Sequence, residues 1–362
     1  MVGNTKKKTL GCATHRTMLT ACALALSIRL PAHGADTPLQ VTGGPEGVNV
    51  EVFQEARYRS GAAPRYPNSE KQGGKEGWVT VNMMIDPKGK PYEITVIDSS
   101  GIAAFEHAAI EAASQVTFTP AKRGDTPIDS STSLKMTFWQ SSPAKGARHD
   151  FVEAYKDLMK ALDSGDQRRA EAALTQLSVQ NLYEDAFLGF GQYQYDRQWG
   201  TEADQLVDLR RAVASERVAR YLPEAVFRAA LVSLFKLEVK LNDFGSALDL
   251  WKTLRPIVQD PTRTELQRAV DQMKAIQSSD QAVHTSQKVD KAANWNGYLF
   301  RNRFDIAVTR GAVSEIKLRC QKQYLFFKYE PGTQYTVNSK DAGECHIEVI
   351  GDPGSIFELT QS

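Results

Sequence analysis

The segment from Val79 to Phe138 constrains the fold most strongly, because the spacing of its apolar side chains changes from a strand period to a helical period and back. Over residues 79–85, two kinds of side chain alternate, which predicts a half-buried strand: Val79, Val81, Met83 and Ile85 on one face, with Thr80, Asn82 and Met84 on the other. Asp86-Pro87-Lys88-Gly89 predicts a tight turn, since proline presets the bend and glycine tolerates positive φ. A second strand over residues 92–97 completes a hairpin.

A helix and a third strand are predicted after the hairpin. Apolar side chains recur there at helical spacing, so one face of a helix can cover the hairpin: Phe105, Ala108, Ala109, Ala112 and Val116. From Ser131 to Trp139 the alternation returns, with Leu134, Met136 and Phe138 set between polar residues. The order strand, strand, helix, strand predicts an α+β domain over residues 47–140, the first of several domains in an α+β multidomain chain.

Six short motifs occur in this domain in a fixed order: Tyr66-Pro67, Glu76-Gly77-Trp78-Val79-Thr80-Val81, Asp86-Pro87-Lys88-Gly89, Ser99-Ser100-Gly101, Ala108-Ala109 and Phe118-Thr119-Pro120-Ala121. With them, residues 60–140 resemble the TonB C-terminal domain family. The resemblance implies a ββαβ fold in the periplasm of a Gram-negative bacterium. It also implies a partner, because the last strand of the family's domain pairs with the TonB box, a short extended segment of an outer-membrane transporter. Such β-augmentation uses the unpaired N–H and C=O groups of a sheet edge.

The resemblance further implies which residues bind the partner. The corresponding strand supplies six of them: Ser133, Leu134, Lys135, Met136, Thr137 and Phe138. Arg65, Tyr66 and Pro67 are added because the Tyr-Pro stretch lies close to the bound segment in the family. Alternatively, Tyr66 and Pro67 only fix the point at which the chain enters the hairpin. The same edge could instead pair with a second copy of the chain in a homodimer.

Residues 1–35 have the features of a signal peptide. Basic residues at positions 6–8 precede an apolar run from Met18 to Ile28, and small residues follow at Gly34 and Ala35. We therefore expect cleavage near residue 35 and a periplasmic mature protein. Two alternatives keep the protein on the membrane: an uncleaved N-terminal anchor, or lipidation of Cys22.

The charge of the chain argues against nucleic-acid binding. Residues 1–35 carry five of the 44 basic residues and none of the 43 acidic ones, so the remaining chain has a net charge of −4. No basic patch that could neutralise phosphates is visible. The histidines after residue 35 lie far apart in the sequence without metal-ligand spacing, and no nucleotide-binding or nucleophile motif occurs. We expect no catalytic residues, no metal and no cofactor.

Residues 149–290 are predicted to form a helical domain, separated from the first by a linker over residues 141–146. Helix–turn–helix patterns recur, as in Ala225–Leu241 followed by Ala247–Leu254, which is typical of an α-solenoid and weakly similar to tetratricopeptide repeats. The adjacent acids Glu184 and Asp185 are expected on a solvated helix face.

Residues 295–362 are predicted to form a small all-β module, because short alternating runs are separated by Pro-Gly turns. Within it, 324–327 is expected to be a buried strand. Cys320 and Cys345 are the two cysteines after residue 35, and in an oxidising compartment they predict a disulfide. Two free thiols are the alternative.

Three hypotheses about function follow. The first is a periplasmic binding or adaptor protein that recognises an extended strand of an outer-membrane transporter or another envelope protein. The second is a membrane-held energy transducer of TonB-dependent transport. Against it, the chain has no Pro-rich spacer, and the TonB-like segment is followed by residues 141–362 instead of ending the chain. The third is an envelope-assembly chaperone or an enzyme without a visible motif.

Overall fold

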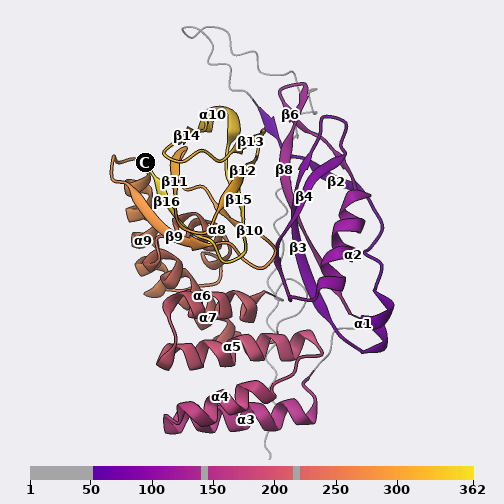
Figure 1. Ribbon diagram of the computed structural model, residues 1–362, viewed down its shortest axis with the longest axis vertical. Helices are drawn as coiled ribbons and strands as arrows, with labels where there is room; N and C mark the ends of the chain where they lie inside the picture. The colour runs from indigo at the N-terminus through magenta and orange to yellow at the C-terminus, as the bar shows by residue number, and fades with distance from the viewer. Residues whose placement is uncertain (1–51, 140–145, 215–220) are drawn as a thin grey trace, which may run out of the picture. The chain divides into compact units, whose positions relative to one another are not determined.

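The computed structural model describes residues 52–139, 146–214 and 221–362 (Figure 1). All of them fall within one compact unit. The predicted signal peptide, the lipidation site Cys22 and most of the predicted linker lie outside the described residues. Among the described helices, none combines the length and apolar character that crossing a bilayer requires.

The first domain is built on a three-stranded antiparallel sheet with one helix across it (Figure 1). The sheet contains β3 (Gly77–Ile85), β4 (Pro91–Ser99) and β8 (Ser130–Phe138) in the order β4-β3-β8, and α2 (Ala103–Ser114) covers one face. The predicted turn joins β3 to β4. Its Gly89 has φ +83°, and a Cβ there would lie 2.0 Å from the carbonyl oxygen of Phe118, so only glycine fits.

Short elements that the sequence did not predict complete this domain. The helix α1 (Asn68–Gln72) precedes the hairpin. The strands form two small sheets, one pairing β2 (Arg57–Ser60) with β5 (Thr117–Thr119), the other containing β1 (Phe53–Gln54), β6 (Ala121–Arg123) and β7 (Thr126–Ile128). Most have two or three residues, too few for a sequence period to reveal.

Strand β3 is not half-buried, as its alternation predicted, but buried on both faces. Val79, Val81 and Met83 pack under α2, as expected. On the opposite face Trp78, Asn82 and Met84 are each at most 1% exposed. We call this opposite side of the β4-β3-β8 sheet the second face; residues from the rest of the chain cover it.

The helical region follows the predicted pattern of successive helices, each packed on its sequence neighbours. It contains α3 (His149–Ser164), α4 (Gln167–Gln176), α5 (Leu182–Trp199), α6 (Glu202–Val213), α7 (Glu224–Lys240), α8 (Phe244–Leu254) and α9 (Thr262–Gln277). Side chains cap the N-termini of several of these helices, including a capping box between Thr201 and Asp204 at the start of α6. Figure 1 shows α3 to α6 stacked layer on layer.

The expectation of a solvated face at Glu184 and Asp185 is wrong, since the two residues are 0% and 2% exposed. Glu184 accepts hydrogen bonds from the backbone N–H and the Nε of Arg148, at 2.8 and 3.0 Å. Asp185 accepts from Arg211 at 2.7 Å. Buried carboxylates persist because each has a guanidinium partner, and that pairing is invisible in a sequence where the partners lie 26 or 36 positions away.

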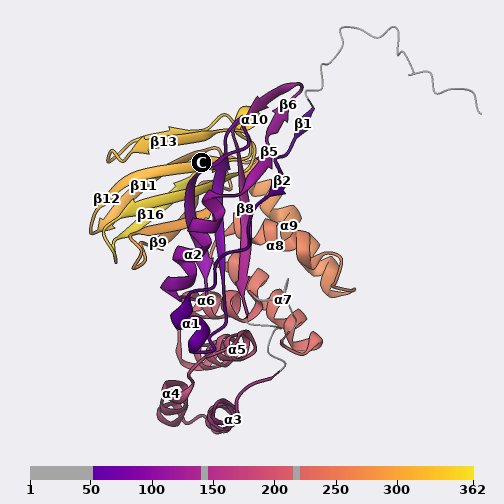
Figure 2. The same cartoon turned by 90° about the vertical axis from the view of Figure 1, so that its right-hand side faces the viewer.

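The C-terminal module consists of two four-stranded antiparallel sheets that enclose one apolar core (Figure 2). One sheet has the order β14-β11-β16-β9, and the other β10-β15-β12-β13. The strands are β9 (Val283–Lys288), β10 (Asn294–Tyr298), β11 (Arg303–Arg310), β12 (Val313–Cys320), β13 (Tyr324–Lys328), β14 (Gln334–Thr336), β15 (Cys345–Gly351) and β16 (Ile356–Gln361), with the short helix α10 (Ser339–Ala342) between β14 and β15.

The predicted disulfide is confirmed, because Cys320 and Cys345 are bonded across β12 and β15. The prediction that 324–327 is a buried strand is wrong. β13 is the edge strand of its sheet, and Phe326 is 52% exposed. An unbroken apolar run therefore does not distinguish a central strand from an edge strand here.

Candidate functional site

Strand β8 is an edge strand of its sheet in the described part of the chain. All nine residues pair in register with β3, from Ser130 opposite Ile85 to Phe138 opposite Gly77, with no bulge. Within the described ranges, no strand pairs with the other side of β8. In an antiparallel pair, successive residues point their N–H and C=O groups alternately toward the partner and away from it. Every second residue of β8 therefore offers a donor and an acceptor at the free edge.

The side chains of β8 divide between the two faces of the sheet. Leu134, Met136 and Phe138 point into the core under α2. Ser133, Lys135 and Thr137 point to the second face, opposite Asn82, Thr80 and Trp78 of β3. Ser133 is exposed, while its two neighbours on this face are half-buried. A strand added at this edge would thus meet a mainly polar row on one side and an apolar row on the other.

Lys135 ties the edge strand to the helical region. Its ammonium group lies 4.1 Å from the ring centre of Trp78 and donates a hydrogen bond to the backbone oxygen of Ala214, directly after α6. Across the sheet, Asp98 lies in the same row as Thr80 and Lys135. The groups around Asp98 partly desolvate its carboxyl and raise its pKa to about 6, against the opposing charges of Lys135 and Arg210, while the outer part of the residue is exposed.

Tyr66 lies beneath the end of β8. Its ring packs edge-on against Phe105 at 5.5 Å and Phe138 at 5.9 Å between ring centres. Its hydroxyl donates to the backbone oxygen of Lys75. Burial, with Glu76 and Glu70 adding to it, raises the pKa of Tyr66 to about 12, so the hydroxyl remains a donor. These contacts hold the chain at the start of the hairpin.

The other two residues predicted around Tyr66 have different surroundings. Arg65 is exposed, and Pro67 is half-buried at the start of α1. Of the strand predicted to bind the partner, Phe138 is in ring contact with Tyr66. A binding role for Arg65, Tyr66 and Pro67 stays a prediction.

A buried polar cluster on the second face was not predicted from the sequence. Arg319 of β12 is 2% exposed; its Nη2 lies 2.6 Å from Oε2 of Glu348, and its Nε donates to the backbone oxygen of Glu93 at 2.8 Å. Glu348 also accepts from Thr95 of β4 at 2.9 Å. Burial by itself would raise the pKa of Glu348, but the charge of Arg319 and these hydrogen bonds outweigh it and lower that pKa.

The cluster connects the C-terminal module to the first domain through ion pairs and hydrogen bonds. Lys317, two positions before Arg319, adds an ion pair with Glu93 at 2.9 Å. The only signal in the sequence is the alternation of charged with apolar residues in β12 and β15, and a solvated strand face produces the same alternation.

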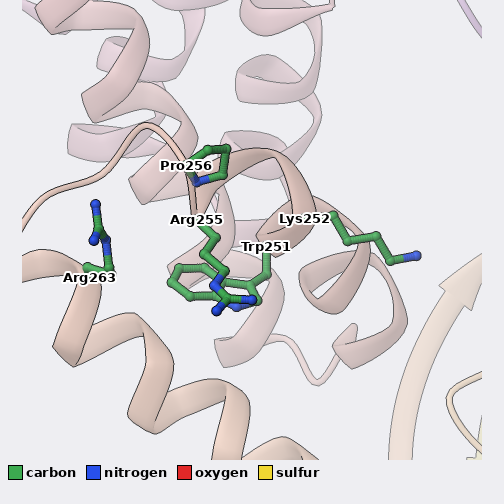
Figure 3. A pocket seen from close by; sticks show the side chains of 5 residues that line it. All are labelled: Trp251, Lys252, Arg255, Pro256 and Arg263. Atoms are coloured by element: carbon green, nitrogen blue, oxygen red, sulfur yellow. The ribbon is translucent and has the colours of Figure 1, made fainter. Parts of the chain in front are cut away.

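A shallow pocket beside α8 and α9 has a basic lining but no built anion site (Figure 3). Lys252 faces Asp249 and Glu344 at 3.2 and 3.3 Å, and Arg263 donates to the backbone oxygen of Val258. Arg255 is exposed to solvent. A carboxylate or phosphate placed there would gain little, because two of its cations already have partners and the third is solvated.

Comparison with known proteins identifies the first domain. The family described as Gram-negative bacterial TonB protein C-terminal matches residues 62–139. These residues are a TonB C-terminal domain. The match ends just after β8, so the free edge belongs to the last strand of the TonB domain.

Known proteins resemble part of this chain. Protein tonB2 of Pseudomonas aeruginosa is 39% identical over 83 residues, covering 23% of this chain and 31% of that protein. Protein TonB of Vibrio cholerae is 30% identical over 86 residues, covering 23% and 35%. The chain thus spans about a third of the length of the curated relatives it matches.

Two solved structures match part of the chain. The solution structure of the Pseudomonas aeruginosa TonB C-terminal domain matches with 21% identity and a TM-score of 0.23, covering 25% of this chain and 91% of that one. The tonB2 protein of Vibrio anguillarum matches with 27% identity and a TM-score of 0.20, covering 30% and 100%.

Proposed function

We propose that this protein is a non-catalytic binding or adaptor protein of the cell envelope, which captures an extended segment of a partner along β8. The observation that carries the proposal is the nine-residue edge strand of a TonB domain that pairs with β3 alone among the described strands. Backbone pairing along such an edge supplies affinity, and the alternating rows of side chains supply selectivity. The TonB box of an outer-membrane transporter is the partner that the family suggests.

The environment of the TonB domain favours an adaptor over a transducer of force. Arg319, Glu348 and Thr95 join the second face to the C-terminal module, and Lys135 joins the edge strand to the end of α6. A partner held at β8 would therefore be connected to both following regions by buried polar contacts. We expect those regions to present a further surface to the same assembly.

Two adjacent proline substitutions test the proposal. Ser131 and Thr132 pair with Met84 and Met83 of β3, and as neighbours they direct their N–H groups to opposite sides of the strand. Proline removes the N–H group. The variant that loses an inward N–H should be destabilised, whereas the variant that loses an outward N–H should fold normally, because proline is tolerated on the solvent side of an edge strand.

Each variant serves as the control for the other. Thermal unfolding of Ser131→Pro and Thr132→Pro identifies the correctly folded one, and isothermal titration calorimetry then measures its affinity for a synthetic TonB-box peptide from a transporter of the same bacterium. We expect at least a tenfold loss of affinity, on the order of one strong backbone interaction plus the local misfit. Unchanged affinity in the folded variant would rule out augmentation along β8.

A further inference from the structure

Strand β13 is a second edge strand, at the outer margin of the C-terminal module (Figure 2). It pairs with β12 over five residues without a bulge, and no strand in the described part of the chain pairs with its other side. Proline, a bulge or charged residues commonly protect such an edge. Residues 324–327 read Tyr-Leu-Phe-Phe and carry none of these protections. No part of the proposed function uses this edge.

The pairing with β12 determines which backbone groups of β13 point outward. The N–H of Tyr329 donates to the backbone oxygen of Ser314 at 2.9 Å, so Tyr329 directs its backbone groups toward β12. Because this direction alternates along an antiparallel strand, the N–H and C=O groups of Tyr324, Phe326 and Lys328 point away from β12. These three positions offer three donors and three acceptors to a further strand.

The side chains of the same three residues lie on one face of the sheet. Tyr324 packs edge-on against Tyr92 of the first domain, with 5.9 Å between the ring centres. Phe326, in the middle of the strand, is 52% exposed, and it is the one large apolar side chain exposed to this degree among the described residues of the C-terminal module. Aromatic side chains are enriched where protein surfaces meet, so this position favours a partner that covers the ring.

The sequence of β13 is complementary to itself in antiparallel orientation. With a two-fold axis at Phe326, Tyr324 pairs with Lys328 of the second copy, and Phe326 pairs with its own copy. All three outward positions are used, and no like charges lie opposite each other. A two-fold axis at Lys328 would instead place two lysines opposite each other, which is unfavourable.

Charges just outside the strand favour the same register. Lys322 and Glu330 each lie four positions from Phe326, so a two-fold axis there brings each toward the opposite charge of the second copy. Glu330 is exposed, and Lys322 donates to a backbone oxygen, that of Lys340, at 3.3 Å. Opposite charges at both ends of an interface help to fix its register. A second copy of this chain therefore fits the edge.

We propose that two copies of this chain join through β13, which pairs antiparallel with β13 of the second copy about a two-fold axis at Phe326. Two four-stranded sheets then become one continuous sheet. The first domain contacts β13 at Tyr324, and antiparallel pairing places Tyr324 of the two copies at opposite ends of the joined strands. Each copy keeps its own β8 edge, so failure of this proposal leaves strand capture at β8 standing.

Sedimentation velocity of the full mature chain at increasing concentrations tests the dimer. The contact is small and of the transient class, so we expect a monomer–dimer equilibrium with a dissociation constant on the order of 10–100 µM. Phe326→Lys and Phe326→Glu keep the backbone groups but set like charges against each other at the axis, and each should weaken dimerisation about tenfold or more. As the matched control, Val207→Lys replaces an exposed apolar side chain of α6 and should leave the equilibrium unchanged.

An equal mixture of the two Phe326 variants locates the axis. A residue that faces its own copy gives repulsion in each variant alone and attraction between the two variants. The mixture should therefore associate about tenfold or more tightly than either variant. Thermal unfolding checks that both variants fold. Hydrogen exchange gives a second measurement on the wild type, because the amides of Tyr324, Phe326 and Lys328 should gain protection as the concentration rises.

Four results would each overturn the proposal. The first is a wild-type chain that stays monomeric at concentrations well above the expected dissociation constant. The second is a dimer that Phe326→Lys leaves unchanged, which would place the interface elsewhere. The third is a mixture of variants that associates no more tightly than each alone. The fourth is protection of the β13 amides by the TonB-box peptide in a monomeric chain, which would assign this edge to a transporter segment.

Discussion

The free edge of β8 and the second face of the same sheet show how differently one TonB domain can treat two surfaces. Along the edge, every second residue of β8 directs its N–H and C=O groups away from β3, and no described strand pairs with them. On the second face Trp78, Asn82 and Met84 are buried, and the Arg319–Glu348 pair lies at the junction with the C-terminal module. The second face is covered by other parts of the chain, whereas the edge has no strand partner among the described residues.

The largest expected effect comes from breaking the Arg319–Glu348 ion pair at the junction between the first domain and the C-terminal module. Arg319→Met leaves Glu348 buried without its cation and should lower the free energy of unfolding by about 3–5 kcal/mol, measured by urea denaturation. The control lies two positions away on the same strand. Lys317→Met removes a more exposed ion pair with Glu93, with side-chain exposures of 19% and 31%, and should cost at most about 1 kcal/mol.

A double variant sharpens this prediction. Arg319→Met with Glu348→Leu removes both charges and should recover most of the lost stability, because the penalty arises from the unpaired carboxylate. If the double variant is as unstable as Arg319→Met alone, the cluster acts through packing and not through charge.

Two buried carboxyl groups, Glu238 in the helical region and Glu348 in the C-terminal module, should change the stability in opposite directions as the pH rises. In the helical region, burial raises the pKa of Glu238 to about 7, although Arg210 lowers it. A raised carboxyl pKa favours folding below the unfolded value near 4.5, and this contribution is lost as the pH rises through about 7. The pKa of Glu348 is lowered instead, so its contribution is present above the unfolded value and is lost as the pH falls through the folded one.

Single substitutions separate the two contributions. Glu238→Gln should remove a decline in stability of about 1–2 kcal/mol between pH 5 and pH 8, followed by thermal unfolding. Glu348→Gln should leave that decline in place and should change how the stability falls at low pH. A profile of Glu238→Gln that still falls as in the wild type would show that this carboxyl is ionised throughout.

The sequence predicts the TonB domain well because its signals are local. The alternation in β3 and β8, the Asp86–Gly89 turn and the spacing of apolar residues in α2 each depend on neighbours within a few positions. The edge position of β8 followed from the resemblance to the TonB family, whose last strand pairs with the partner. The disulfide followed from having two cysteines in one module.

What the sequence does not predict depends on residues far apart in the chain. Thr95 and Glu348, or Glu93 and Arg319, are separated by 253 and 226 positions, and no period connects them. Thr80, Asn82 and Met84 are compatible with a solvated face, so β3 was predicted to be half-buried. Glu184 and Asp185 resemble surface acids until Arg148 and Arg211 lie beside them.

The smallest expected effect concerns a side chain on β8 itself. Lys135→Met loses the contact with Trp78 and the hydrogen bond to Ala214, and we expect a loss of stability of about 1 kcal/mol. Affinity for the TonB-box peptide should change less than about threefold, because backbone groups carry the pairing. A much larger loss, measured by calorimetry, would mean that the side chains of β8 dominate recognition.

Hydrogen exchange of the β8 amides tests the central claim most directly. In the free protein, amides that bond to β3 should exchange slowly, and those in alternate positions from Ser130 to Phe138 should exchange fast. On addition of the TonB-box peptide, we predict that the fast set becomes protected while the slow set changes little. Protection that appears on the helical region or the C-terminal module, with the fast β8 amides unchanged, would contradict strand capture at this edge.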